Sequence, residues 1–197
     1  MKLEKITLYQ LSMPLITPFE TSFGRIDRRE CILVEVHTDG ITGYGECPAD
    51  RDPGYSYETT GTAWHILSEF LIPGVLGGEV YGPEDLQQRM AAVRGHQMAK
   101  AGLEMAIWDV MGKAQGRPLR ALLGGVRERV EVGVSVGLQE SPTALVIVVE
   151  GYLAQGYRRI KIKIKPGREV EETVAVRQRY PDLRLQVDAN SAYTLEN

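Results

Sequence analysis

The chain has 197 residues, of which 43% are hydrophobic and 25% are charged, and its formal net charge is −3. This is the composition of a globular protein with one or two domains, and its slight acidity argues against a nucleic-acid-binding protein, which normally carries a basic surface. Because no apolar run approaches the roughly 18 residues that cross a bilayer, we expect neither nucleic acid nor membrane as a partner.

The N-terminal part of the chain begins with predicted strands. Residues 2–13 lack the apolar centre of a signal peptide and are expected to form a strand. Residues 32–37 and 41–46 flank Asp39-Gly40, which predicts a β-hairpin. These strands favour a domain that opens with an antiparallel sheet.

Helices are predicted to follow the hairpin. Ser56 is a candidate N-cap for a helix that runs to about Leu71, and Pro83 opens a second helix. Residues 97–114 carry apolar side chains at spacings of three and four, which predicts a longer helix. A short turn of helix at 119–123 completes this α+β region, and we place a domain boundary after Gly125.

Beyond Gly125 the pattern changes to alternating strands and helices. Strands are expected at 130–137, 158–165 and 183–188, with helices at 141–155 and 168–179 between them. This βαβαβ order predicts a parallel sheet. Each strand alternates apolar with polar or small residues, which favours a closed barrel with a functional interior over a doubly wound sheet. Since three strands cannot close a barrel of about eight, we expect a longer enzyme or another element at the open edge.

The polar faces of these strands carry the candidate catalytic residues. Lys161 and Lys163 point the same way about 6.6 Å apart, and their repulsion favours the uncharged amine that a general base requires. Asp188 ends its strand, where a barrel builds its active site, and a carboxylate there suits a divalent cation. Ser135 faces the same interior, and Ser135 and Asn190 are candidate substrate contacts. Asn190 is alternatively expected to shape the turn beside the site.

Each of these residues also has a purely structural interpretation. The lysines would form a solvated face of an edge strand, Asp188 would cap a helix or form a salt bridge, and Ser135 would be a small residue in a tight interior. The cysteines Cys31 and Cys47 are expected to be free thiols in a cytoplasmic protein, with a disulfide across the hairpin as the alternative.

Several segments together resemble the enolase superfamily, in its muconate-cycloisomerase-like subgroup. Lys161-Ile162-Lys163 and Asp188-Ala189-Asn190 resemble its two strand motifs, and residues 99–125 resemble the end of its capping domain. The sequences KIKIKPG, VDANSAYT and GYGECPADRDPGYSYET are similar to those of o-succinylbenzoate synthases, including those that also racemise N-acylamino acids. The resemblance runs from Lys2 to Asn197.

The resemblance implies a fold and a set of roles. Residues 1–125 would form an α+β capping domain, and 126–197 the first three βα units of a modified (β/α)7β barrel. Asp188 matches the first of three acidic ligands of magnesium, with manganese or another divalent cation as alternatives. Lys163 matches the base that removes the proton α to a carboxylate, and Lys161 matches its electrostatic neighbour. The reaction would be the dehydration in menaquinone biosynthesis, a racemisation, or both.

The resemblance also implies partners and missing parts. The substrate would be a small carboxylate bound partly by Phe19 and Phe23, unless these two rings belong to the core. The full-length enzyme would be a homo-oligomer. The other metal ligands and the opposing lysine match nothing in residues 1–197, so the remaining barrel half is needed and we expect the isolated chain to be inactive.

Two departures and two alternatives accompany the resemblance. Arg168-Glu169 replaces a common Trp-Asp pair and is interpreted as a surface change, and Asp50 stands at a loop position that is often apolar in racemising relatives. A dipeptide epimerase or muconate cycloisomerase shares the same motifs. A non-catalytic assembly or interaction module is the alternative from another class.

Overall fold

The computed structural model describes residues 1–196; Asn197, the last residue of the expected second domain, lies outside the described residues. The chain forms two compact units. Unit 1 consists of Met1–Pro14 and Arg28–Val126, and unit 2 consists of Leu15–Asp27 and Arg127–Asn197. The tip of an N-terminal hairpin therefore belongs with the C-terminal part of the chain, which the sequence analysis did not anticipate.

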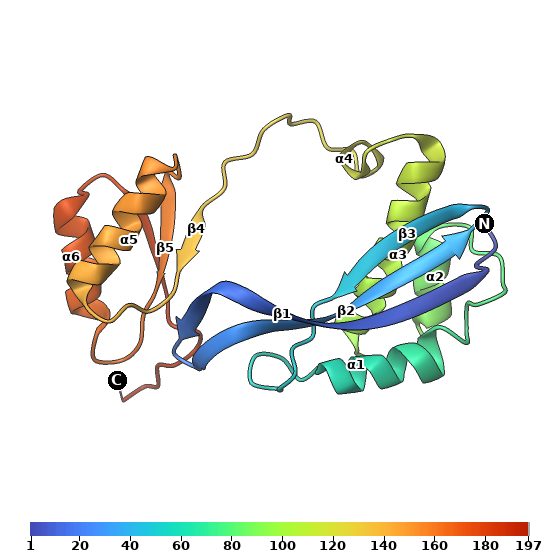
Figure 1. The fold of residues 1–197 in the computed structure, drawn as a ribbon, viewed down its shortest axis with the longest axis horizontal. Helices are drawn as coiled ribbons and strands as arrows, with labels where there is room; N and C mark the ends of the chain where they lie inside the picture. The colour runs from blue at the N-terminus through green and yellow to red at the C-terminus, as the bar shows by residue number, and fades with distance from the viewer. Residues whose placement is uncertain (197) are drawn as a thin grey trace. The chain divides into compact units, whose positions relative to one another are not determined.

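Unit 1 combines a three-stranded sheet with helices (Figure 1). Its strands are β1 (Lys5–Thr21) and β2 (Gly24–Thr38), whose tip at residues 15–27 belongs to unit 2, and β3 (Ile41–Cys47). Its helices are α1 (Thr60–Ile66), the π-helical turn η1 (Leu67–Leu71), α2 (Pro83–Met90), α3 (Gln97–Gln115) and α4 (Leu119–Leu122). The predicted hairpin is confirmed, because β2 and β3 pair antiparallel around Asp39 and Gly40, whose φ angles are 48° and 75°. Positive φ at both positions is what a tight two-residue hairpin turn requires.

The strands β1 and β2 extend beyond the predicted 2–13 and 32–37 because they form a long ribbon. Pro14 and Pro18 lie inside β1. Proline is tolerated on an edge strand, where its missing N–H removes no ladder hydrogen bond, and β1 is at the edge of the sheet order β1-β2-β3. Pattern alone therefore ended the strand too early.

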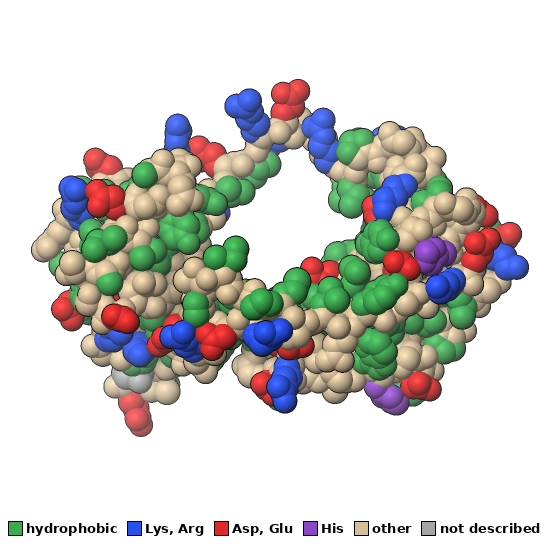
Figure 2. Space-filling model, viewed as in Figure 1, with side chains coloured by type: hydrophobic (Ala, Val, Ile, Leu, Met, Phe, Trp, Pro, Cys, Tyr) green, Lys and Arg blue, Asp and Glu red, His purple; other side chains and the backbone are tan. Residues whose placement is uncertain are grey.

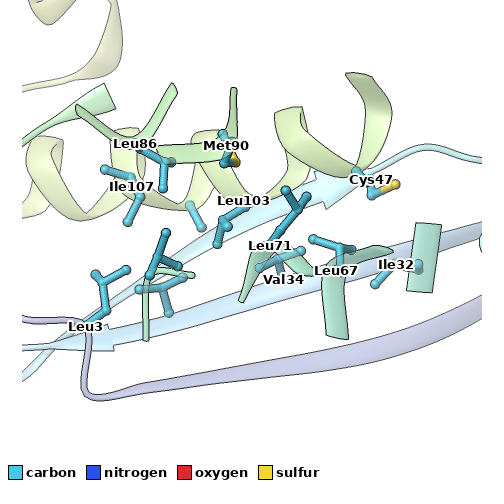
Figure 3. Packing of buried hydrophobic residues seen from close by; sticks show 14 of the residues in the cluster. Leu3, Ile32, Val34, Cys47, Leu67, Leu71, Leu86, Met90, Leu103 and Ile107 are labelled. Carbon is cyan, nitrogen blue, oxygen red and sulfur yellow. The ribbon is translucent and has the colours of Figure 1, made fainter. Parts of the chain in front are cut away.

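The core of unit 1 lies between the sheet and the helices (Figure 3). Leu103 and Ile107 of α3 are fully buried with Val34 of β2. Glycine makes the close approach of α3 to β3 possible, since a Cβ at Gly45 would lie 2.0 Å from the carbonyl oxygen of Gly102. Helix α3 and strand β3 thus pack backbone against backbone.

Helix α1 has a different N-cap from the predicted one, and the N-terminus of helix α3 is capped by a side chain from outside the helix. Helix α1 is capped by Thr59, not Ser56, with the Thr59 hydroxyl accepting from the Thr62 N–H. Helix α3 receives its cap from a distant residue: the buried carboxylate of Glu58 accepts the N–H groups of Met98 (2.9 Å) and Ala99 (3.1 Å). This satisfies donors that the helix itself leaves unpaired.

Unit 2 contains a parallel sheet in the order β4-β5-β6. Its elements, besides the hairpin tip, are β4 (Val134–Val136), α5 (Pro142–Ala154), β5 (Arg159–Lys163), α6 (Glu169–Arg179) and β6 (Arg184–Asp188). The predicted βαβαβ order is confirmed, and Ser141 caps α5 as expected. Strand β4 is shorter than the predicted 130–137, because its ladder with β5 begins at Val134 paired with Ile160.

Apolar side chains of the three strands pack against the helices of unit 2, whereas Val187 of β6 is 45% exposed. Ile160 and Ile162 are fully buried in one cluster with Leu145 and Val149 of α5 and Val176 of α6. Because side chains alternate along a strand, the intervening polar residues point to the opposite face of the sheet. The functional candidates therefore share one face.

The surface charges, the helices and the cysteines agree with what the composition indicates. Lys and Arg side chains are interspersed with Asp and Glu over the visible face (Figure 2). Within residues 1–196, no helix combines the length and apolar character needed to cross a membrane. Cys31 and Cys47 are both buried and free, as expected.

Candidate active site

The site is built from the ends of two neighbouring parallel strands. Lys163, the last residue of β5, stands directly opposite Asp188, the last residue of β6. The Nζ atoms of Lys161 and Lys163 each lie 2.9 Å from the same carboxylate oxygen, Oδ2 of Asp188. The predicted neighbourhood of lysine and carboxylate is confirmed, whereas their catalytic roles remain a prediction.

Burial distinguishes the two lysines. The side chain of Lys163 is 7% exposed, whereas that of Lys161 is 32% exposed. The pKa of the Asp188 carboxyl is held well below its usual range, because hydrogen bonds from Lys161, from Lys163 and from the Asn190 N–H stabilise the carboxylate. The negative charge of Asp188 offsets the repulsion between the two amines that their spacing implies.

The turn after β6 completes the surroundings of the buried amine. Asn190 Oδ1 accepts a hydrogen bond from Lys163 Nζ at 2.6 Å, and the Asn190 N–H donates to Asp188 Oδ1 at 3.0 Å. Asn190 and Ser191 have φ angles of 50° and 61°, which are uncommon for residues other than glycine. Asn190 therefore lies in the turn, as predicted, and also contacts Lys163, while its role as a substrate contact stays a prediction.

The neighbouring strand β4 contributes Ser135 to the same face. Ser135 stands opposite Lys161 in the ladder between β4 and β5. Its Oγ is buried, and among the described residues it has no hydrogen-bond partner. A buried hydroxyl with no protein partner is free to bind a ligand, but its role in substrate binding stays a prediction.

The hairpin tip of unit 2 lies beside this sheet (Figure 1). Phe23 is 55% exposed, which excludes the core interpretation for this ring. Phe19 is partly buried, and a Cβ at Gly137 would meet its ring at 3.3 Å. Ser22 Oγ donates to the carbonyl oxygen of Ala189 at 2.7 Å. Ser22 carries no signal in the sequence, since nothing in the pattern links residues 167 positions apart.

The residues present do not form a complete magnesium site. Within residues 1–196, no group of three or more His, Cys, Asp or Glu side chains is placed to hold a metal ion. Asp188 supplies a carboxylate oxygen of the kind that magnesium prefers, but it is a single carboxylate that two lysines already bind. The described part of the chain therefore provides one candidate ligand, Asp188.

The two departures from the family pattern have structural roles. Arg168 is not a surface change: it forms a 2.5 Å ion pair with Glu172, which is 1% exposed, and donates to the Gln139 carbonyl oxygen at 2.7 Å. It therefore connects the segments that follow β4 and β5. In unit 1, Asp50 forms an ion pair with Arg29 at 2.9 Å.

Polar side chains gathered at the carboxyl ends of parallel strands are typical of enzymes built from βα units. Residues 5–124 match the family model described as mandelate racemase / muconate lactonizing enzyme, N-terminal domain. The chain belongs to this family, within the enolase superfamily.

Two curated relatives are similar along nearly the whole chain. The chain is 50% identical over 194 residues to an o-succinylbenzoate synthase of Geobacillus stearothermophilus, covering 98% of this chain and 52% of the relative. It is 48% identical over 197 residues to an N-succinylamino acid racemase of Thermus thermophilus, covering 100% and 53%. The chain thus spans about half the length of these relatives.

Solved structures show the same fold. An enolase-superfamily protein from Listeria innocua matches with a TM-score of 0.92 at 38% identity, covering 99% of this chain and 53% of that one. A dipeptide epimerase from Enterococcus faecalis, complexed with Mg and the dipeptide L-Leu-L-Tyr, matches with a TM-score of 0.88 at 26% identity, covering 98% and 55%.

Proposed function

We propose that this chain carries the capping domain and the proton-abstracting strands of an enzyme that removes the proton α to a carboxylate. The enzyme would act as an o-succinylbenzoate synthase, an N-acylamino acid racemase, or both. The observation that carries the proposal is the array of Lys161, Lys163 and Asp188, in which both amines lie 2.9 Å from one carboxylate oxygen at the ends of parallel strands. The similarity to relatives with both names supports it.

In this proposal Lys163 is the base and Lys161 its electrostatic partner. The step requires the deprotonated form of the Lys163 amine, which takes the α-proton and becomes an ammonium group. The electron pair left behind spreads over the substrate carboxylate as an enediolate. The Lys161 ammonium favours this anion electrostatically. In the synthase reaction, Lys163 then returns its proton to a departing hydroxyl group, which leaves as water. Burial of Lys163 limits access of water to the amine.

The metal and the complete barrel are proposed for the whole protein only. Asp188 would be one oxygen ligand of a magnesium ion, with further ligands from polypeptide outside residues 1–197. Such an ion supplies positive charge to the oxygens of a bound carboxylate. The strands β4, β5 and β6 would be the first three of a modified (β/α)7β barrel, after a capping domain of residues 1–125. We place the enzyme in the cytoplasm, with small carboxylates as substrates.

A dipeptide epimerase is the second candidate, supported by the epimerase structure that shares this fold. It would use the same lysine to remove an α-proton, so the two proposals differ in substrate and share the chemical step. A direct assay of α-proton exchange therefore tests the common step, and a non-catalytic module would show none.

The experiment uses a chimera in which residues 1–197 replace the matching half of the Geobacillus stearothermophilus synthase. We expect magnesium-dependent formation of o-succinylbenzoate, and exchange of the α-proton of N-succinylamino acids with D2O, measured by NMR. Lys163→Ala should lower either rate by roughly 10²–10⁴-fold, the usual contribution of general acid–base catalysis.

Lys165→Ala is the matched control, because it lies in the same run of alternating lysines but follows the end of β5 at Lys163. We expect its rates to stay within about threefold of the parent chimera. Equal rates for Lys163→Ala and the parent would refute the proposed base. Turnover by residues 1–197 alone, abolished by Lys163→Ala, would contradict the expectation that the isolated chain is inactive.

A further inference from the structure

Within unit 2, the hairpin tip contacts the C-terminal part of the chain at two points, each next to a strand of the site. The carbonyl oxygen of Glu20 accepts the N–H of Leu138 at 2.9 Å, just after β4. Gly137 permits this contact, because a Cβ there would lie 3.0 Å from the same oxygen. The second contact is the 2.7 Å hydrogen bond from Ser22 Oγ to the Ala189 carbonyl oxygen, just after β6.

The tip is itself restrained. Only Ser22 and Phe23 separate β1 from β2, and the Phe23 N–H donates to Thr21 Oγ1 at 3.1 Å. A two-residue turn with an internal hydrogen bond offers the Ser22 hydroxyl little freedom to move independently of its backbone. The turn therefore holds Ser22 in a defined local conformation, and the hydrogen bonds at Leu138 and Ala189 attach the tip to the segments that follow β4 and β6.

What Ser22 contacts is the turn that presents Asn190 to the buried amine. The Ala189 carbonyl oxygen accepts two hydrogen bonds, one from Ser22 and one from the Ala192 N–H at 3.1 Å. The next residue, Asn190, has a φ of 50° and accepts from Lys163 Nζ at 2.6 Å. A left-handed conformation outside glycine persists when surrounding contacts hold it, and Ser22 supplies such a contact.

We propose that Ser22 is a positioning residue: through the Ala189 carbonyl it holds the 188–191 turn, so that Asn190 Oδ1 and the Asp188 carboxylate stay in contact with Lys163. One hydroxyl, that of Ser22, then links the hairpin tip to the turn that contacts the Lys163 amine. The catalytic part of this proposal rests on the proposed function, whereas the structural part is independent of it.

The structural part is tested on the purified chain without substrate, by amide hydrogen exchange over residues 188–192. Ser22→Ala should raise exchange in this turn by roughly fivefold, the factor expected from loss of one hydrogen bond. Ser22→Thr keeps the hydroxyl and should restore the parent rate. Ser68→Ala, which removes a serine hydroxyl from η1 in unit 1, is the matched control and should leave the turn unchanged. Unchanged exchange in Ser22→Ala would overturn the proposal.

The catalytic part is tested on the chimera described above. Ser22→Ala should lower kcat by roughly fivefold and leave KM within about twofold, because misplacement of Lys163 slows the proton transfer more than it weakens binding. A rise in KM with unchanged kcat would overturn the positioning role in favour of a direct substrate contact. An inactive parent chimera would count against the proposed function, while the exchange experiment would still decide whether Ser22 holds the turn.

Discussion

The two units use their secondary structure for different purposes. In unit 1, eighteen buried hydrophobic residues among those described form one cluster between a sheet and its helices. In unit 2, the corresponding cluster has seven, which come from the strands, from the residue after β5 and from the helices that cover the sheet. The opposite face carries Lys161, Lys163 and Asp188. A sheet that carries polar, reactive side chains on one face can pack a hydrophobic core only against its other face.

The comparison predicts that the stability of unit 1 depends most strongly on the close packing of the α3 backbone against the β3 backbone. Gly45→Ala would place a Cβ 2.0 Å from the Gly102 carbonyl oxygen, so α3 would have to move away from β3. We expect a loss of about 3 kcal/mol or more in the free energy of unfolding of unit 1, measured by urea denaturation, because overpacking against backbone has no inexpensive relaxation.

Gly54→Ala is the control for that variant, since a Cβ at Gly54 meets nothing within 4 Å. It should leave the urea midpoint nearly unchanged. Equal midpoints for Gly45→Ala and Gly54→Ala would show that the close packing of α3 on β3 is not what limits the stability of unit 1.

The smaller core of unit 2 predicts a second, local effect. Ile162→Ala removes a fully buried side chain from the middle of β5 and should cost about 3 kcal/mol, the usual range for such a cavity. Ile147→Ala, on α5 with 64% of its surface exposed, should cost less than about 0.5 kcal/mol. Amide exchange should rise in β4–β6 and stay unchanged in α3. A rise of similar size in both units would mean that they unfold together.

A third prediction concerns the pH dependence of the stability of unit 1, because both cysteines lie in that unit. Burial raises the pKa of the Cys47 thiol to about 11 from an ordinary value of 9.0. Above pH 9 the unfolded chain loses this proton while the folded chain keeps it, so stability falls as pH rises from 9 towards 11. Two pK units correspond to about 2–3 kcal/mol.

The measurement is the unfolding free energy as a function of pH for the parent and for Cys47→Ala. Cys31 is present in both proteins, so the difference in slope isolates Cys47. We expect a shallower alkaline decline in the variant. Identical slopes would contradict the burial effect on this thiol.

Local pattern was sufficient where a short segment determines its own geometry. The alternation of Ile160, Ile162 and their lysine neighbours indicated a two-faced strand, and Asp39-Gly40 indicated the hairpin turn. Pattern failed at element ends: β4 starts at Val134, four residues later than predicted, because a ladder needs a partner and alternation does not show where the partner begins.

Contacts between distant residues were beyond any pattern. Glu58 caps α3 across 41 positions, and Ser22 reaches Ala189 across 167. Arg168 looked like a surface substitution until the fold placed it against Glu172 and Gln139. None of these side chains differs in type from ordinary loop or surface residues, so only their three-dimensional neighbours reveal their roles.

The sequence by itself determined the order of strands and helices and which face of each strand is polar, because the two-residue period of a strand is a local property. Only the tertiary structure decided that both lysines bind one oxygen of Asp188 and that a distant hairpin donates a hydrogen bond to the turn beside them. Those contacts depend on the register between β5 and β6 and on packing between segments far apart in the chain, and neither is a property of any single segment.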